Sequence, residues 1–206
     1  MQLFVPFAVD RPKTRLSEIL SASERREFSR VMLADVLDAL AAVSLDGDTP
    51  EPTVLATGPI DIDAPVVVDE RPLDPAVNDR LDTTPTAIVM ADLALATPEA
   101  LERLLTAPGD LAIAAGLGGG TNAFIARDSA FHVDYHGASY RDHLAIARDA
   151  GLAVTEVDSR RLAVDIDESA DLTELLLHGE GAARDWLVDA GFELVTTGGR
   201  VRATRE

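Results

Sequence analysis

The chain contains no cysteine, and Lys13 is the only lysine among its 18 lysine and arginine residues. The absence of cysteine excludes disulfides and thiolate metal sites. No apolar run approaches the roughly 18 residues that a membrane-spanning helix needs, so we expect no membrane partner. The short apolar start, residues 1–9, has no basic leader and ends in charge. It therefore predicts a first strand rather than a signal peptide, and a cytoplasmic protein.

Positive charge is scarce as well, because 36 aspartates and glutamates leave a formal net charge of −18. Nucleic-acid binding needs a basic surface, so we expect no nucleic-acid partner. The acidic residues are scattered along the chain rather than gathered in one tail. An acidic, lysine-poor surface is typical of a protein that stays soluble at very high salt, where charge repulsion is screened. This halophilic character concerns the solvent and leaves the activity open.

A chain of 206 residues is long enough to bury a substantial core, and we expect one domain over residues 1–206. In the first half of the chain, short apolar runs alternate with helical periodicity. The expected strands occupy residues 3–9, 53–57, 65–69, 86–95 and 110–115, and the expected helices residues 23–43, 74–81 and 98–105. This alternation predicts an α/β fold with a mostly parallel central sheet.

The second half of the chain predicts shorter strands, further helices and a closing hairpin. The expected strands are 123–126, 131–136, 152–157 and 162–166, and the expected helices are 139–150, 168–177 and 180–189. A glycine pair at 198–199 predicts the turn of the hairpin over residues 192–204. Some strands of the protein should therefore pair in the antiparallel sense.

Three of the expected helices begin at recognisable capping residues. Asp74, followed by a proline, and Thr97, followed by a proline, are typical of an N-cap with proline at the first helical position. Ser139 with Asp142 matches a capping box.

Ligands of an open parallel sheet bind beyond the carboxyl ends of its strands, and the loop after the first strand holds Lys13 and Arg15. A lysine and an arginine two residues apart can converge on phosphates, the lysine as a point charge and the arginine as a fork. The alternative is a solvated basic loop. The uniqueness of the lysine favours the phosphate site, because a chain depleted in lysine would otherwise carry arginine here.

Two carboxylates follow expected strand ends and suggest a divalent-cation site. Asp92 ends the apolar run IVMAD, where its side chain would lie at the edge of the sheet. The run 162–166 leads to Asp165 and Asp167, and we expect only one of them, Asp167, to join Asp92. The alternatives are a turn or N-cap role for Asp92 and an N-cap role for Asp167.

The glycine run GLGGGTN spans residues 116–122 and follows an expected strand. Gly120 and its neighbours would let the backbone approach a ligand closely and aim successive N–H groups at an anion. Its spacing matches neither a Walker loop nor GxGxxG. A simple turn is the alternative, and the polar Thr121 and Asn122 directly after it favour a site.

A second constellation lies in FHVDYH, where His132, Asp134 and His136 would share one face of a strand. With His143 nearby, these residues suggest a transition-metal site as a rival to the carboxylate pair. Solvated or hydrogen-bonded strand residues are the alternative. A helix beginning just after Gly137 could also present N–H groups to an anion.

Collinear stretches of this chain resemble one family. They are PKTRLSEILSASERREF, VVVDERPLDPAVNDRL, IVMADLAL, GLGGGTNAF, YHGASYRDH and DIDESADLTELLLHGEGAARDWL. They resemble the CofC family, the 2-phospho-L-lactate guanylyltransferases of coenzyme F-420 biosynthesis, which belong to the MobA-like nucleotidyltransferases. The resemblance implies a three-layer, Rossmann-like nucleotidyltransferase fold and a homodimer. Together with the acidic composition it indicates a haloarchaeal protein.

The resemblance also implies a reaction, in which GTP and 2-phospho-L-lactate give lactyl-2-diphospho-5'-guanosine and pyrophosphate. It implies that Asp92 and Asp167 bind Mg²⁺ and act in catalysis together with Lys13. Lys13 and Arg15 would hold the triphosphate of GTP, and Asn78 would contact the nucleotide. The residues expected to hold the acceptor are Gly120, Thr121, Asn122, Gly137 and Ser139.

The chain departs from the family where DLALA replaces the usual DLPLL, which leaves Asp92 in place. His136 stands where relatives often carry another aromatic or polar residue. Phosphoenolpyruvate is an alternative acceptor, because it differs from phospholactate at one carbon. A molybdenum-cofactor guanylyltransferase is a further alternative, but the glycine-rich loop expected after its first strand is missing. The last alternative is a non-catalytic GTP-binding module.

Overall fold

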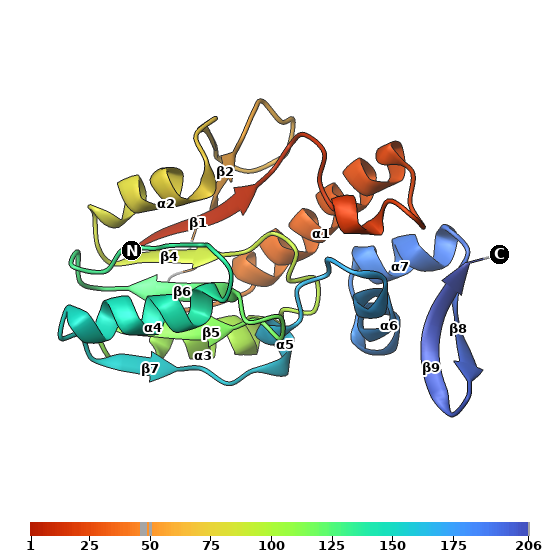
Figure 1. The fold of residues 1–206 in the computed structure, drawn as a ribbon. Coiled ribbons are helices and arrows are strands. Elements are labelled where there is room, and N and C mark those ends of the chain that lie inside the picture. The colour runs from red at the N-terminus through yellow and green to blue at the C-terminus, as the bar shows by residue number, and fades with distance from the viewer. Residues whose placement is uncertain (46–48, 50, 206) are drawn as a thin grey trace.

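The computed structural model of the protein describes residues 1–45, 49 and 51–205, and these residues form a central sheet of seven strands. The strand order is β3-β2-β1-β4-β6-β5-β7 (Figure 1). The strands are β1 (Gln2–Phe7), β2 (Thr53–Ala56), β3 (Val66–Val68), β4 (Thr86–Val89), β5 (Leu111–Ala115), β6 (Thr121–Ala126) and β7 (Val154–Glu156). Strand β6 is antiparallel to β4 and β5, and the other pairings are parallel. The predicted α/β fold with a mostly parallel sheet is confirmed.

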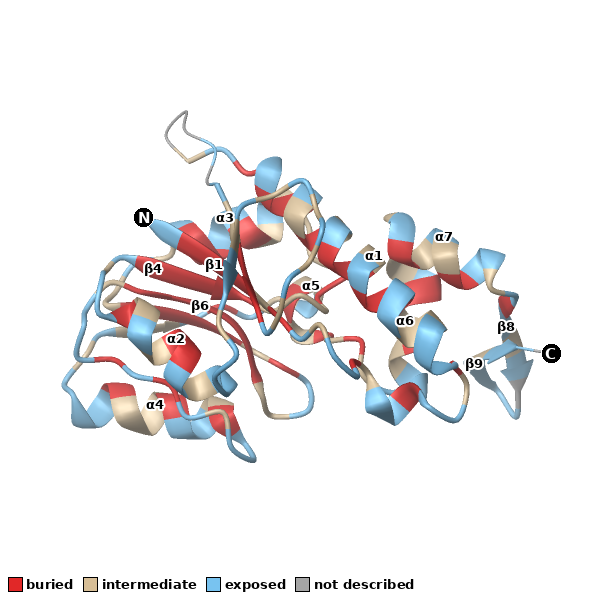
Figure 2. Ribbon diagram, turned by 90° about the horizontal axis from the view of Figure 1, so that it is seen from above, coloured by how far each residue is buried: buried red, intermediate tan, exposed pale blue. Residues whose placement is uncertain are grey.

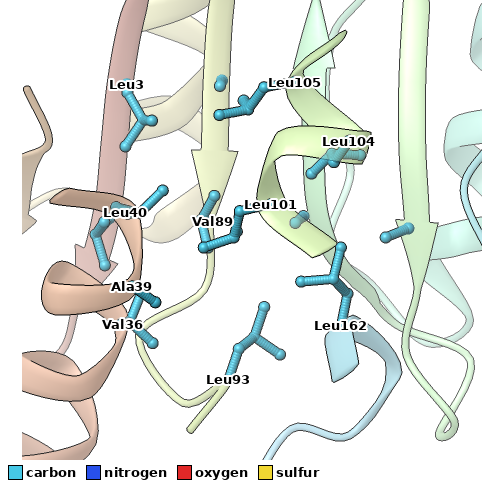
Figure 3. Close-up of a cluster of buried hydrophobic side chains, with 14 of the residues drawn as sticks. Leu3, Val36, Ala39, Leu40, Val89, Leu93, Leu101, Leu104, Leu105 and Leu162 are labelled. Atoms are coloured by element: carbon cyan, nitrogen blue, oxygen red, sulfur yellow. The ribbon is translucent and has the colours of Figure 1, made fainter. Parts of the chain in front are cut away.

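Helices cover both faces of this sheet and make the three layers (Figures 1 and 2). Alternation along β1 sends Leu3 and Val5 to one face and Phe4 to the other. The first face packs against α1 (Ala22–Ala41), α3 (Pro98–Thr106) and α5 (Arg160–Ala163), and Figure 3 shows the resulting leucine-rich cluster. The second face packs against α2 (Leu73–Leu81) and α4 (Ser139–Asp149).

The long helix α1 also carries the C-terminal elements. A capping box between Ser21 and Glu24 fixes its start. Its first half packs against helix α7 (Ala182–Asp189), where the rings of Phe28 and Trp186 stack with centroids 4.9 Å apart. Asp35 of α1 accepts hydrogen bonds from the first two amides of α7. Figure 1 shows α6 (Ser169–His178) and α7 on the side of α1 away from the sheet, with the hairpin of β8 (Phe192–Thr197) and β9 (Arg200–Arg205) beyond them.

Most of the predicted elements are present, and the differences lie where side-chain contacts replace regular pairing. The predicted strand at 131–136 is an irregular segment, and the predicted strand at 162–166 begins inside α5 and continues without a pairing partner. The predicted N-cap role of Asp74 is wrong, because α2 begins at Leu73 and the Asp74 carboxylate instead accepts a hydrogen bond from the Tyr135 amide, 2.9 Å away. Thr97 caps α3 as predicted.

The closing hairpin is confirmed as β8 and β9. Among the helices within the described ranges, none combines the length and the apolar character needed to cross a membrane.

Candidate active site

The candidate site lies at the carboxyl ends of β1 and β4. These strands are parallel neighbours, so the loop after β1 and the residues after β4 meet at the same edge of the sheet. Strand β6 begins at this edge, because it is antiparallel to β4 and the Met90 amide bonds the Asn122 carbonyl at 3.0 Å. The topology therefore brings three of the predicted features together: the Lys13 loop, Asp92 and the residues after the glycine run.

Lys13 lies at the centre of this edge. Its ammonium is 2.6 Å from Asp92 Oδ2 and 3.7 Å from Asp167 Oδ1, and only 10% of its side chain is exposed. The backbone at Lys13 has a φ of 53°, in the left-handed region, just before a short 3₁₀ turn. For a residue with a side chain this conformation costs about 1–2 kcal/mol, so the surrounding contacts must hold it in place. The predicted meeting of Lys13, Asp92 and Asp167 is present.

The segment carrying Asp165 and Asp167 reaches Asp92 through a backbone hydrogen bond rather than a strand end. The Ile166 amide bonds the Asp92 carbonyl at 3.1 Å. The intervening Val164 and Ile166 are buried in a hydrophobic core cluster together with residues of α1 and α6. Asp167 lies 3.7 Å from the Lys13 ammonium, and Asp165 lies near enough to Asp92 for that charge to raise its pKa. That only one of the two aspartates joins Asp92 in a cation site stays a prediction, since these three carboxylates do not form one of the described groups whose ligand atoms all lie within 4.8 Å.

Asp165 is a third carboxylate near Lys13, beside Asp92 and Asp167, and it was not among the predicted site residues; these three carboxylates are called the carboxylate cluster below. Burial raises the pKa of its carboxyl, and the negative charge of Asp92 raises it further. The amide nitrogen of Asn122 donates to Asp165 Oδ1 at 3.2 Å and to the Leu162 carbonyl at 3.0 Å. The i, i+2 spacing in DID was the sequence signal for its participation. Asp165 thus faces the cluster with an orientation set by Asn122.

These carboxylates fit a hard divalent cation. Asp92 Oδ1 is buried and has no hydrogen-bond partner among the described residues, although Oδ2 of the same group bonds Lys13. A buried carboxylate oxygen without a partner is costly, and a cation would satisfy it. Oxygen ligands from several carboxylates are those that Mg²⁺ prefers. The residues present therefore fit the predicted Mg²⁺, with Asp92 and Asp167 as candidate ligands.

Arg15 lies at the rim of the cluster. Its guanidinium is 2.5 Å from Asp167 Oδ2 and 3.7 Å from Glu168, and 65% of its side chain is exposed. The predicted N-cap alternative for Asp167 does not match the structure, because Glu168 occupies the N-cap of α6 and forms a capping box with Asp171. Asp167 is therefore available to the cluster and to Arg15.

The glycine run forms a tight turn between the antiparallel strands β5 and β6. The Gly116 amide bonds the Gly120 carbonyl at 2.8 Å, and the Gly119 amide bonds the Gly116 carbonyl at 2.9 Å. A Cβ on Gly116 would lie 2.6 Å from Asn122 Oδ1, so a larger residue would have to displace the Asn122 side chain from its hydrogen bonds. These two amides donate to carbonyls of the turn itself, which is what the alternative interpretation of the glycine run as a simple turn predicts. Anion binding by the Gly120 region stays a prediction.

Thr121 belongs to a buried hydrogen-bond chain. His143 is completely buried, and desolvation lowers its pKa to about 4, so the ring is neutral near pH 7. Its Nε2 accepts a hydrogen bond from the Asp134 amide at 2.9 Å, which places the ring proton on Nδ1. That Nδ1–H donates to Thr121 Oγ1, 2.8 Å away. The Thr121 hydroxyl therefore keeps its own proton free to donate.

Ser139 and Gly137 lie beside Thr121 at the start of α4. The predicted capping box of Ser139 and Asp142 is wrong, because the helix has Ala138 at its N-cap and no side-chain cap. The Ser139 hydroxyl instead accepts a hydrogen bond from the Thr121 amide at 3.1 Å. Gly137 has a φ of 56°, which turns the chain into the helix. The four predicted acceptor residues Gly120, Thr121, Gly137 and Ser139 are thus contiguous, while Asn122 turns toward Asp165.

A pocket with a volume of about 280 Å³ lies at this sheet edge, and Lys13 and Asp92 are among its lining residues. Asp69 and Arg71, which follow β3, also line it. Its walls are mostly apolar, formed by residues that include Pro6, Phe7, Met32, Leu55, Leu73, Ala76 and Met90. The sequence reasoning did not select Asp69 and Arg71, although DER directly after a predicted strand end was a signal of the same kind as Asp92.

Asn78 does not line this pocket. Its amide group exchanges two hydrogen bonds with the backbone of Val133, at 2.8 and 3.0 Å, and so ties α2 to the irregular segment 131–136. The predicted contact of Asn78 with the nucleotide stays a prediction that no contact in the structure supports.

The rival histidine constellation is rearranged relative to the prediction. His136 pairs with Asp134 and Asp74, and a cation would find ligand atoms of these three residues within 4.8 Å of one another. His132 is exposed and not part of the group, and His143 is buried in the Thr121 chain. Hydrogen bonding to Asp134 raises the pKa of His136, which is expected of an exposed ion pair.

Comparison with known proteins identifies relatives of the whole chain. Residues 1–204 match the model of a family described as guanylyl transferase CofC like. Proteins named 2-phospho-L-lactate guanylyltransferase are 60% identical in Halomicrobium mukohataei, covering all of both chains, and 56% identical in Haloferax volcanii, covering 100% of this chain and 99% of the relative. These haloarchaeal relatives fit the acidic composition.

Two solved structures share the fold. A protein from Desulfovibrio desulfuricans, provisionally described as a nucleotide-diphospho-sugar transferase, superposes with a TM-score of 0.72 at 17% identity, covering 92% of this chain and 95% of its own. A nucleotidyl transferase from Methanothermobacter gives a TM-score of 0.55 at 15% identity, covering 86% and 96%. They confirm the predicted nucleotidyltransferase fold. The full-length family match and the identity to its members show that the chain belongs to the CofC family.

Proposed function

We propose that this protein transfers the guanylyl group of GTP to 2-phospho-L-lactate, giving lactyl-2-diphospho-5'-guanosine and pyrophosphate in coenzyme F-420 biosynthesis. The observation that carries the proposal is the convergence of Lys13, Asp92 and Asp167, with Lys13 and Asp92 lining a largely apolar pocket. A pocket of this kind suits a nucleotide base, and a charged cluster at its end suits the phosphates. The names of the full-length relatives support the choice of substrates.

The reaction forms one phosphorus–oxygen bond and breaks another. A phosphate oxygen of the acceptor attacks the α-phosphorus of GTP, and the bond from that phosphorus to the bridging oxygen of the β-phosphate breaks. The electron pair leaves with pyrophosphate. Because no covalent enzyme intermediate is needed, the protein acts by positioning the reactants in line and by neutralising charge.

Lys13 is the residue best placed to neutralise the triphosphate. Its ammonium lies among the carboxylates with little exposure, and a compact cation suits the charge that develops on the departing pyrophosphate. Arg15 at the rim is exposed and free to turn from Asp167 toward the outer phosphates. Its planar fork can hold two phosphate oxygens at once.

Mg²⁺ would be held by Asp92 and Asp167, whose carboxylates flank Lys13. When bound, the ion supplies Lewis-acid neutralisation of phosphate oxygens. Asp165 faces the same cluster, and Asn122 orients it. In the absence of the ion, the Lys13 ammonium keeps the carboxylates from repelling one another.

The acceptor would lie next to the start of β6. The free proton of the Thr121 hydroxyl can donate to a phosphate or carboxylate oxygen, and the neutral His143 behind it holds that hydroxyl in place. Gly120, Gly137 and Ser139 adjoin Thr121 and shape the backbone there. Phospholactate and phosphoenolpyruvate share the phosphate and carboxylate that these groups would contact, so the choice between them needs experiment.

The experiment that tests the proposal offers GTP with 2-phospho-L-lactate, phosphoenolpyruvate or 3-phosphoglycerate, at molar KCl with Mg²⁺. Mass spectrometry identifies the diphosphate-linked product, and pyrophosphate release gives the rate. We expect product with phospholactate. If GTP and phospholactate give neither pyrophosphate nor product, while another pair does, the proposed activity is wrong. The cytoplasmic location and the homodimer remain predictions, and sedimentation at molar salt tests the second.

A further inference from the structure

The part of the pocket farthest along the sheet from Asp92 is formed after strand β3. Strands β3, β2, β1 and β4 are successive parallel neighbours, so their carboxyl ends lie along one edge. Three strand spacings of about 4.8 Å place the ends of β3 and β4 about 14 Å apart. This span suits a nucleoside monophosphate lying along the edge, with its phosphate near Asp92 and its base near Asp69 and Arg71.

Asp69 and Arg71 form a fixed pair at this end of the pocket. The Asp69 side chain is only 7% exposed, and its amide continues the pairing to β2 by bonding the Ala56 carbonyl at 2.8 Å. Arg71 bonds Asp69 through two nitrogens, with Nε 2.8 Å from Oδ1 and Nη2 2.6 Å from Oδ2. Hydrogen bonding from Arg71 lowers the pKa of Asp69 to about 2, so the pair is ionised at any working pH.

The fork geometry leaves part of Arg71 available to a ligand. Nε and Nη2 are used by Asp69, and Nη2 also contacts Asp79 at 3.1 Å. Nη1 enters none of the hydrogen bonds found among the described residues, and 47% of the Arg71 side chain is exposed. Arg71 therefore lines the pocket as a hydrogen-bond donor whose orientation is set by a buried carboxylate.

We infer that Arg71, held by Asp69, reads the base of the nucleotide and selects guanine over adenine. Guanine presents two adjacent acceptors, O6 and N7, to a donor at this edge, whereas adenine presents an amino group in place of O6. The Nη1 of Arg71 can donate to O6 of guanine, whereas the amino group of adenine at that position is itself a donor and cannot accept. The inference deepens the proposed function and rests on it, since it assigns a nucleotide-specificity residue in the same site.

Arg80 offers a matched control. It also contacts Asp69, at 3.3 Å, and carries the same charge, but it stacks over Phe4 and does not line the pocket. We expect Arg71→Gln to lower the affinity for GTP about 10- to 100-fold and to leave ATP binding unchanged or improved, because glutamine can pair with adenine. Arg80→Gln should leave the GTP-to-ATP ratio as in the wild type.

The test is titration calorimetry of GTP and ATP with Mg²⁺ at molar KCl, without acceptor, followed by kcat/KM for pyrophosphate release. Because Arg71 is half exposed, the variant should fold, and its melting temperature checks this. If the wild-type protein binds GTP and the Arg71→Gln variant has the same ratio of GTP affinity to ATP affinity, the inference is overturned and the proposed function stands. A wild-type protein that binds neither nucleotide overturns both.

Discussion

Replacing Lys13 by methionine removes the cation from the centre of the carboxylate cluster while keeping the length of the side chain. The ammonium lies 2.6 Å from Asp92 and 3.7 Å from Asp167, and the aspartate side chains are 26% and 28% exposed. Truncating one partner of a buried ion pair costs roughly 3–5 kcal/mol. Because water reaches part of both carboxylates, we expect a loss of about 2–3 kcal/mol in the free energy of unfolding.

For a chain of this size, that loss lowers the melting temperature by roughly 5–10 °C in Mg²⁺-free buffer. Added Mg²⁺ should restore more stability to the variant than to the wild type, because no ammonium competes for the carboxylates. Turnover with GTP and phospholactate should fall at least about 100-fold, since a charge-stabilising group is lost. Thermal unfolding with and without Mg²⁺, together with pyrophosphate release, measures all three effects.

The matched control is Arg160→Met, which breaks an exposed ion pair with Glu174 on the surface. An exposed pair contributes at most about 1 kcal/mol, so this variant should unfold near the wild-type temperature and show no added response to Mg²⁺. The reasoning is refuted if Lys13→Met matches the wild type in stability and turnover, or if its response to Mg²⁺ equals that of the wild type.

Three further predictions follow from the same structure. Gly116→Ala should destabilise the protein by about 1–3 kcal/mol, because its Cβ would meet Asn122 at 2.6 Å, whereas Gly118→Ala has open space and should unfold like the wild type; equal denaturant midpoints would contradict this. The pKa of His143 is lowered from 6.5 to about 4 in the folded protein. Between these pH values the unfolded chain therefore binds a proton that the folded protein does not. The free energy of unfolding should fall as the pH drops from about 6.5 to 4. His143→Gln should lose that part of the slope in urea unfolding, and an unchanged slope would refute the assignment. Lys13→Arg keeps the charge but replaces a compact ammonium by a planar fork and should slow turnover, so a fully active variant would show that any cation suffices.

The fold could be predicted from the sequence because it depends on local patterns, and the same patterns selected the candidate site residues. Apolar runs located the strands, and the rule that ligands lie beyond carboxyl ends selected Lys13, Asp92 and Asp167 before their contacts were visible. In the structure the Lys13 ammonium lies within ion-pair distance of both carboxylates. Of these residues Asp92 lies just beyond the end of a strand, β4, whereas Asp167 follows an unpaired segment.

The errors arose where contacts between distant segments decide the local structure. The segment 131–136 has the alternation of a strand, but Asn78 and Asp74 bond its backbone and take the place of a pairing partner. Asp165 was set aside because only one of the two aspartates was expected to join Asp92, whereas in the structure Asp165 lies near enough to Asp92 for that charge to raise its pKa. The bonds that hold segment 131–136 join residues 55 and 61 positions apart, so no local pattern contains both partners.

The most direct test of the account is Asp92→Asn, a nearly isosteric change that removes one carboxylate from the cluster. We would measure pyrophosphate release from GTP and 2-phospho-L-lactate at molar KCl and saturating Mg²⁺, with circular dichroism to verify the fold. The account predicts a folded protein whose rate falls about 1,000-fold, because Asp92 is both a candidate metal ligand and the partner of Lys13. A folded variant that keeps its rate within tenfold of the wild type would contradict it.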